Sequence, residues 1–156
     1  MIFVTIGTQI HFDRLIVAID EIAATLKEEP VIVQTLKGKY QPKHVQVVDF
    51  LSPDEFNNYV NNARLIVSHA GMGSILSALE QRKPIIIFPR LASLGEHRND
   101  HQMATAMKMN ELGYVYVAYD KKQLKELILK KDLQPLKMIG KSALSRFIES
   151  ITEPIK

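Results

Sequence analysis

A histidine, two glycines and a serine follow one apolar segment of the chain, and together they could bind an anion. Residues 64–68 are apolar and β-branched, which predicts a buried strand. The chain continues as His69-Ala-Gly71-Met-Gly73-Ser74, and helical spacing of apolar residues begins at about residue 73. Glycines let the backbone approach a ligand, and the N–H groups and dipole at a helix start attract negative charge. We therefore expect an anion site here, with a diphosphate as the ligand.

The same residues have simpler interpretations. Paired glycines also allow a helix to begin close to its sheet, without any ligand. His69 can be a hydrogen-bonded residue at the end of the strand. Glu80, about two helical turns further on, can be a solvated helix residue. The spacing alone leaves these alternatives open.

A second polar cluster, EHRNDHQ, occupies residues 96–102. Asn99 and Gln102 have the form of a capping box, which needs no ligand. His97 and His101 are four residues apart, but the helix is expected to start only at Asn99, so we expect no metal here. Amides and carboxylates pair well with hydroxyl groups, so we interpret the cluster as a contact to a polyhydroxylated group.

The elements that must position these residues alternate along the chain. Apolar strand segments at 2–6, 31–36, 45–50, 64–68, 85–88 and 114–118 are separated by amphipathic helical segments. Strands that are apolar on both faces predict a parallel sheet covered by helices on both sides. The fold class is thus α/β, a Rossmann-like doubly wound sheet of about six strands. Its strand-end turns at 7–9, 69–74 and 89–102 should converge on one ligand.

Local signals set several helix boundaries. Ser52, Pro53 and Glu55 predict an N-cap, a first helical residue and a capping box. Asp120 predicts another N-cap, and Gly113 the end of the preceding helix. Residues 135–151 form an amphipathic segment that is either a core helix of the single domain 1–156 or an element that docks a partner.

Composition excludes several classes of protein. Hydrophobic residues make up 46% of the chain and charged residues 24%, which is typical of a globular domain. The chain has no cysteine, so neither a disulfide framework nor a cysteine zinc site is expected. The net charge is +3, and its basic residues show no interleaving with aromatic ones, so we expect no nucleic-acid partner. The first residues indicate a strand rather than a signal peptide, which favours a cytoplasmic location.

With both clusters placed, the sequence resembles the C-terminal, donor-binding domain of the family 28 glycosyltransferases, which have the two-domain GT-B fold and include the MurG transferases. The motifs are VTIGTQ with FDRLI, SHAGMGS, KPIIIFPR and EHRNDHQ, and they cover roughly residues 1–130. Free-standing versions of this domain are the closer match. They include the small cytosolic subunit of the two-subunit N-glycan transferase and the PssE type of bacterial exopolysaccharide synthesis. The GTQIHFDRLI opening and the HRNDHQ segment are more similar to the PssE type.

The resemblance implies a UDP-sugar as the substrate, with no cofactor and no metal. It implies roles only for residues at positions that match the motifs of the family. The diphosphate would lie on Gly71, Gly73 and Ser74, with His69 beside them and the ribose on Glu80. The nucleotide would lie near Arg90, the sugar near Asn99, His101 and Gln102, and the other wall of the site would be Gly7 and Thr8.

The resemblance also implies a partner. A GT-B enzyme needs an acceptor domain, which we expect on a separate, membrane-associated chain of the PssD type that recruits this chain to the inner face of the membrane. The expected reaction is inverting transfer of a sugar to a lipid-diphosphate-linked glycan. Its general base would be His11, His69 or a group of the partner chain.

Three other functions are alternatives. The first is a non-catalytic subunit that stimulates a partner transferase. The second is a dinucleotide-dependent oxidoreductase, which would need Gly-x-Gly-x-x-Gly after the first strand, where this chain has Gly-Thr-Gln. The third, a GT-B epimerase, needs two domains in one chain.

Overall fold

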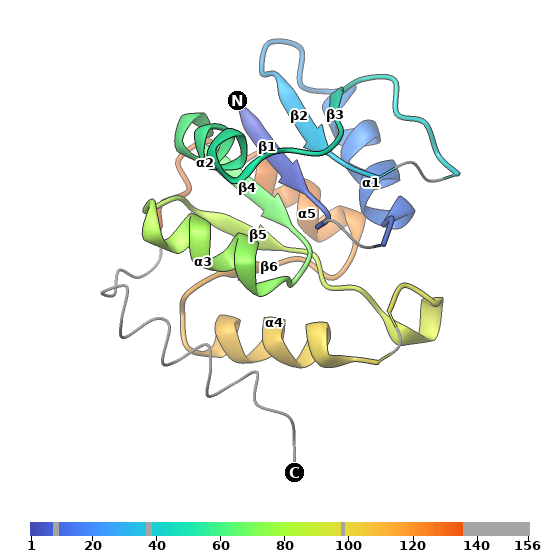
Figure 1. Cartoon of the computed structure of the whole chain (residues 1–156), viewed down its shortest axis with the longest axis vertical. Helices are drawn as coiled ribbons and strands as arrows, with labels where there is room; N and C mark the ends of the chain where they lie inside the picture. The colour runs from blue at the N-terminus through green and yellow to red at the C-terminus, as the bar shows by residue number, and fades with distance from the viewer. Residues whose placement is uncertain (8–9, 37–38, 98, 136–156) are drawn as a thin grey trace.

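A sheet of parallel strands forms the centre of the computed structural model, which describes residues 1–7, 10–36, 39–97 and 99–135 (Figure 1). The strand order is β3-β2-β1-β4-β5-β6, and every neighbouring pair is parallel. The strands are β1 (Ile2–Thr5), β2 (Val31–Gln34), β3 (Gln46–Val48), β4 (Leu65–Ser68), β5 (Ile85–Ile87) and β6 (Tyr116–Val117). The predicted Rossmann-like architecture is confirmed.

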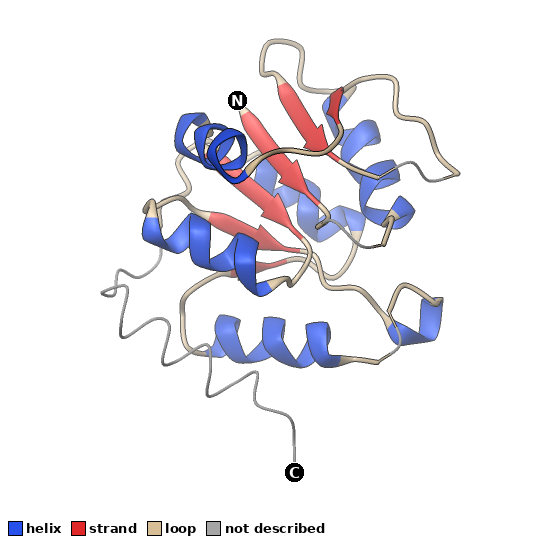
Figure 2. Cartoon of the chain, in the orientation of Figure 1, coloured by secondary structure: helices blue, strands red, loops and turns tan. Residues whose placement is uncertain are grey.

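Helices cover both faces of this sheet (Figure 2). In the described part of the chain they are α1 (Asp13–Ala23), α2 (Pro53–Asn62), α3 (Met72–Glu80), α4 (His101–Glu111) and α5 (Lys121–Ile128), with a short 3₁₀ turn, η1 (Ala92–Leu94). Buried residues of α1 and α5 pack on one face, and those of α2, α3 and α4 pack on the other. β1, β2, β4 and β5 therefore contribute to both cores, which explains their apolar sequences, whereas β3 at the edge of the sheet is largely exposed.

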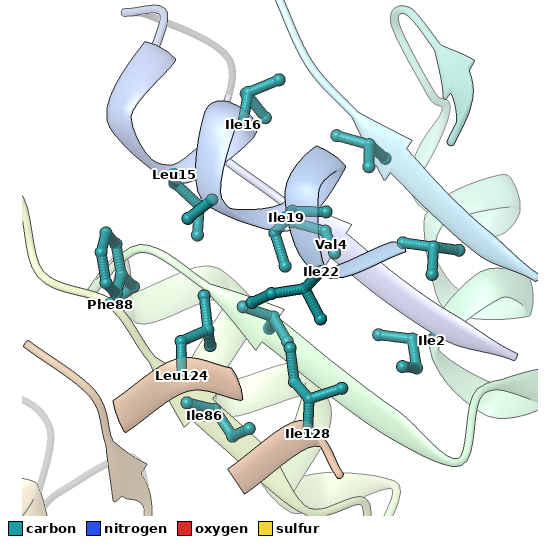
Figure 3. Packing of buried hydrophobic residues seen from close by; sticks show 14 of the residues in the cluster. Ile2, Val4, Leu15, Ile16, Ile19, Ile22, Ile86, Phe88, Leu124 and Ile128 are labelled. Carbon is teal, nitrogen blue, oxygen red and sulfur yellow. The ribbon is translucent and has the colours of Figure 1, made fainter. Parts of the chain in front are cut away.

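The larger core lies between the sheet and the pair α1 and α5 (Figure 3). Ile19 and Ile22 of α1 meet Val4 of β1 there, together with Leu124 and Ile128 of α5, and all five are at most 2% exposed. Burying one such side chain stabilises the fold by about 1.5–3 kcal/mol. This core holds β1 in place, and β1 carries the first strand-end turn.

The helix starts at Ser52 and Asp120 are confirmed. The Ser52 hydroxyl accepts a hydrogen bond from the Glu55 N–H, and the Glu55 carboxylate accepts one from the Ser52 N–H, both at 3.2 Å. The Asp120 carboxylate accepts from the Gln123 N–H at 2.8 Å. Gly113 adopts a positive φ of 80° directly after Leu112, the C-cap residue of α4, as predicted.

The predicted capping box of Asn99 and Gln102 is wrong. Helix α4 begins at His101, two residues later than expected, and Asp100, which precedes it, makes no side-chain cap. The Asn99 side-chain oxygen accepts from the His101 N–H at 3.0 Å. The Gln102 side chain turns away from the helix start and towards His69, where a cavity lies.

The segment predicted as a C-terminal helix, 135–151, lies almost wholly outside the described residues, so its role stays a prediction. Within the part of the chain that is described, no helix combines the length and apolar character needed to cross a bilayer.

A buried carboxylate, that of Asp20 on α1, holds the loop between β2 and β3. Asp20 is 2% exposed and accepts hydrogen bonds from the Tyr40 hydroxyl at 2.5 Å and from the N–H groups of Lys43 and His44 at 3.0 and 2.7 Å. Burial by itself would raise the pKa of Asp20, but these hydrogen bonds outweigh burial and lower it.

We predict that Asp20→Ala lowers the free energy of unfolding by about 2–3 kcal/mol, because it leaves buried donors without an acceptor. The neighbouring carboxylate supplies the control. Glu21 pairs with Lys121 with both side chains about half exposed, so Glu21→Ala should cost under about 1 kcal/mol. Urea denaturation measures both. Since the pKa of Asp20 is lowered, its contribution should disappear as the pH falls below about 4. Equal losses in the two variants would contradict this assignment.

Candidate functional site

A cavity of about 510 Å³ opens at the carboxyl edge of the sheet. Its walls come from the ends of β1 and β4, the start of α3, the start of α2 and the loop between β5 and α4. β1 and β4 are neighbours at the point where the strand order reverses direction. In open parallel sheets such a point is where ligands bind, because the turns on its two sides diverge.

Helix α3 begins at this cavity. Gly71 is its N-cap residue and makes no side-chain cap, so the N–H groups of its first turn are left to other acceptors. Gly73, Ser74 and Ser77 also line the cavity. The uncapped N–H groups, the helix dipole and two hydroxyls together suit an anion.

The ring of His69 fills the space between the two turns that flank the cavity. A Cβ atom built on Gly71 would lie 2.4 Å from the ring, and one built on Gly7 would lie 2.9 Å from its Nε2 atom. Gly7 also has a positive φ of 84°. The two glycines are therefore needed for a second reason that the sequence did not reveal, which is to admit this imidazole.

His69 is also fixed by a hydrogen bond and is uncharged at neutral pH. The Gln102 amide Nε2 lies 3.1 Å from His69 Nδ1, while Gln102 Oε1 accepts from the Arg90 N–H at 3.3 Å. This orientation of the amide makes Nδ1 the acceptor and places the ring proton on Nε2. Burial, and then the charge of Arg90, lower the pKa of His69 to about 4.

Arg90 holds the turn after β1 against the loop after β5. Its side chain is buried, at 2% exposure, and burial lowers its pKa while nearby Glu96 opposes this. The guanidinium donates to four backbone carbonyl oxygens, those of Ile6 (2.8 Å), Ile10 (2.6 Å), His11 (2.8 Å) and Glu96 (3.3 Å). It also lies 4.6 Å from the ring centre of Phe12. With its donors used in this way, Arg90 shapes the cavity more than it offers hydrogen bonds to a ligand.

The structure brings together most of the site residues predicted from the sequence. Those that line the cavity are Gly7, His69, Gly71, Gly73, Ser74, Arg90 and Gln102. Four others do not line it: His11, Glu80, Asn99 and His101. Thr8 lies outside the described residues.

Glu80 lies outside the cavity lining, which its position on α3 explains. It is the exposed last residue of α3, six residues after Ser74. Six residues correspond to about 9 Å along the helix and about 120° around it. The Glu80 carboxylate therefore does not line the cavity, whereas Ser77, three residues earlier, does.

Several lining residues were not predicted from the sequence. The polar ones are Thr5, Gln34, Asn57 and Ser77, and the apolar ones include Leu51, Pro53 and Phe56. His97 also lines the cavity, and it belongs to the cluster at 96–102 that was expected to contact a polyhydroxylated group, although it was not singled out there. Gln34 ends β2 and accepts from the Thr5 hydroxyl at 2.6 Å, a contact that depends on strand order. Of these, Ser77 could have been predicted, because it lies on the same helix as the glycine turn, three residues after Ser74. Among the described residues no carboxylate lines the cavity, and no three His, Asp or Glu side chains gather as a metal site.

A parallel α/β sheet with a cavity at its switch point is the architecture of Rossmann-like domains, in which ligands bind at this edge of the sheet. Residues 1–153 match the glycosyltransferase family 28 C-terminal domain, and the chain belongs to this family. The family expected from the sequence motifs is thereby confirmed.

Relatives of known name are UDP-N-acetylglucosamine transferase subunits ALG13. The mouse protein is 30% identical over 124 residues, which is 73% of this chain and 10% of the relative. The Candida albicans protein is 28% identical over 93 residues, which is 60% of this chain and 30% of the relative. The matches thus cover less than a third of either relative.

Solved structures show the same fold. An NMR structure of ALG13 has a TM-score of 0.63 at 20% identity and covers 94% of this chain and 93% of that one. The MurG crystal structure from Acinetobacter baumannii has a TM-score of 0.59 at 13% identity and covers 95% of this chain and 49% of that one. Half of that larger protein therefore corresponds to this whole domain.

We predict opposite effects for two alanine substitutions in the glycine turn. Gly71→Ala places a methyl group against the His69 ring and should lower the free energy of unfolding by about 1–3 kcal/mol. A Cβ at Gly73 meets no atom within 4 Å, so Gly73→Ala should be neutral or stabilising by up to about 1 kcal/mol. Urea denaturation compares them, and a tolerated Gly71→Ala would show that the ring is not confined.

The lowered pKa of His69 predicts a pH dependence of stability. Protonation favours the unfolded chain, so the contribution of the neutral ring is complete above about pH 6.5 and is lost as the pH falls from about 6.5 to about 4. In urea titrations across this range, His69→Gln should lose less stability than the wild type. His11→Gln, at an exposed position, should follow the wild-type slope. A wild-type slope in His69→Gln would show that His69 titrates normally.

Proposed function

We propose that the protein is the donor-binding subunit of a two-component inverting glycosyltransferase, and that it binds a UDP-sugar in the cavity between β1 and β4. The observation that carries the proposal is the uncapped start of α3 at this cavity, where Gly71, Gly73 and Ser74 lie together. Family membership and the names of the ALG13 relatives support the reaction class and the choice of UDP.

The lining of the cavity fits the parts of such a ligand. The diphosphate would accept hydrogen bonds from the first turn of α3. The apolar side chains of Leu51, Pro53 and Phe56 offer a surface for a nucleobase. The amides of Asn57 and Gln102 can both donate to and accept from sugar hydroxyls.

The proposed chemistry places the leaving group on this chain. A hydroxyl of the acceptor attacks the anomeric carbon, the bond from that carbon to the diphosphate oxygen breaks, and UDP leaves. The α3 dipole and N–H groups would stabilise the charge that develops on the diphosphate, without need of a metal. His11 lies outside the cavity, and the Nδ1 atom of His69 is already bonded, so we assign the general base to the partner chain.

Exposed apolar side chains support the proposal of a partner. Four of them lie in loops that follow strands β1, β3, β5 and β6 at the edge where the cavity opens: Ile10 (43% exposed), Phe50 (78%), Leu94 (58%) and Tyr119 (39%). A protein surface that covers them would also close the cavity. The proposed partner is a membrane-associated, acceptor-binding chain of the PssD type with a lipid-diphosphate-linked glycan. The location would then be the cytoplasmic face of the membrane, and the pathway that of an exopolysaccharide.

A second candidate is a non-catalytic subunit that stimulates or stabilises such a transferase. One observation favours this interpretation: among the described residues no carboxylate lines the cavity, and the His69 ring is fixed by its hydrogen bond. The cavity therefore offers no evident general base. The two readings differ in whether the cavity takes up donor.

Calorimetric titration with UDP, alongside UMP, ADP and NAD, tests the proposal. UDP should bind and NAD should not. Gly73→Leu projects a side chain into the cavity from a position with free space, so it should fold and weaken UDP binding at least about tenfold. Glu80→Ala should bind UDP like the wild type, because the carboxylate lies outside the cavity.

Two results would contradict the proposal. Unchanged affinity in Gly73→Leu, with loss in Glu80→Ala, would move the ligand to another surface. Absence of UDP binding in the isolated chain would call for the same titration on the chain co-expressed with its acceptor-type partner. Absence there as well would leave the non-catalytic role.

A further inference from the structure

Three ionisable side chains line the cavity in the described part of the chain: His69, Arg90 and His97. The lining contains no Asp, Glu, Lys or Tyr there, so every charge that the cavity can carry is positive. An anionic ligand would therefore meet no repelling carboxylate, and each imidazole near it would gain affinity for a proton.

Two of these three side chains already form hydrogen bonds with other groups of the protein. Arg90 donates to four carbonyl oxygens. His69 is confined by Gly7 and Gly71 and is bonded to Gln102 through Nδ1. Neither can turn towards a ligand without breaking these contacts.

His97 differs from both. Its Nδ1 atom is buried and has no hydrogen-bond partner. A buried polar atom without a partner costs about 1–3 kcal/mol, and such atoms are uncommon in native structures. The ring of His97 can turn without breaking a hydrogen bond to Nδ1, and it lies in the loop between β5 and α4 that forms one wall of the cavity.

None of the charged groups near His97 is bonded to its Nδ1 atom, so a bound anion would be the group that favours protonation of the ring. Arg90 and His69 line the same cavity, and the pKa of His69 is lowered by burial, by the charge of Arg90 and, less, by the charge of His97. The carboxylate of adjacent Glu96 is bound by Arg14 at 2.9 Å and by the Leu91 N–H at 3.0 Å. The carboxylate of Asp100, at the start of α4, accepts from the Ala92 N–H at 3.0 Å. Both nearby carboxylates thus have other hydrogen-bond partners, and neither is bonded to His97 Nδ1.

We propose that His97 binds the diphosphate part of the ligand and takes up a proton as it does so. The inference rests on the proposed function, because it needs an anion in this cavity. The proton comes from solvent, and the resulting imidazolium donates a charge-assisted hydrogen bond to a phosphate oxygen. Binding should then strengthen as the pH falls from about 8 to about 6, by up to about tenfold per pH unit for one proton.

Proton uptake can be measured directly. Titrating the chain with UDP at pH 7 in buffers of different ionisation enthalpy gives the number of protons taken up per UDP bound. We expect His97→Gln to take up a fraction of a proton fewer than the wild type and to bind UDP about tenfold more weakly. UDP exchanges protons through its own phosphate, but this contribution is common to both proteins and cancels in the difference.

His44→Gln is the matched control. This histidine is exposed and lies on the loop between β2 and β3, away from the cavity lining, so proton uptake should equal that of the wild type. A second measurement needs no substitution. The NMR titration midpoint of the His97 ring should move to higher pH when UDP is added, and that of His44 should stay in place.

The outcomes separate the two proposals. Equal proton uptake in the wild type and His97→Gln, with an unmoved His97 midpoint, would overturn the inference and leave UDP binding intact. If neither the chain nor its complex with the partner binds UDP, the donor-binding function itself fails, and the inference fails with it.

Discussion

The buried guanidinium of Arg90 is the interaction on which the site depends. It binds backbone carbonyls of the turn after β1 and of the loop after β5, two segments about eighty residues apart in sequence. Because these carbonyls converge on one cation, Gly7 is held at the distance where the His69 ring fits between it and Gly71. The Gln102 side chain then bonds both the Arg90 N–H and His69, which ties α4 to the same centre.

The polar groups of the cavity are of two kinds: some are bonded to other protein groups and shape the cavity, and others are available to bond a ligand. Arg90, His69 and Gln102 satisfy one another or the backbone. The start of α3, the hydroxyls of Ser74 and Ser77 and the unpartnered His97 are not used in this way. A polar cavity whose walls are already bonded does not have to reorganise when an anion enters, which lowers the cost of binding.

Sequence and structure agree best where the determining interactions are local. The capping box of Ser52 and Glu55 joins residues three apart, and it forms as predicted. Asn99 and Gln102 have the same spacing, but the tertiary contacts of Gln102 with Arg90 and His69 replace the cap, and α4 starts later. A local signal therefore decides a helix end only where no distant partner competes for the same side chain.

The parallel α/β sheet and the glycine turn at its edge can be predicted from the sequence alone, because apolar strands, helix caps and glycines act over a few residues. Only the tertiary structure decided which polar side chains share the cavity. Gln34, Asn57 and His97 enter it, while Glu80 and His101 do not. Gln34 ends a strand and His97 lies in a loop, so their places depend on strand order and on the path of the loop. For helical residues the reason is geometric: each successive side chain turns by about 100°, so its place depends on how the helix is rotated against the sheet by its buried face.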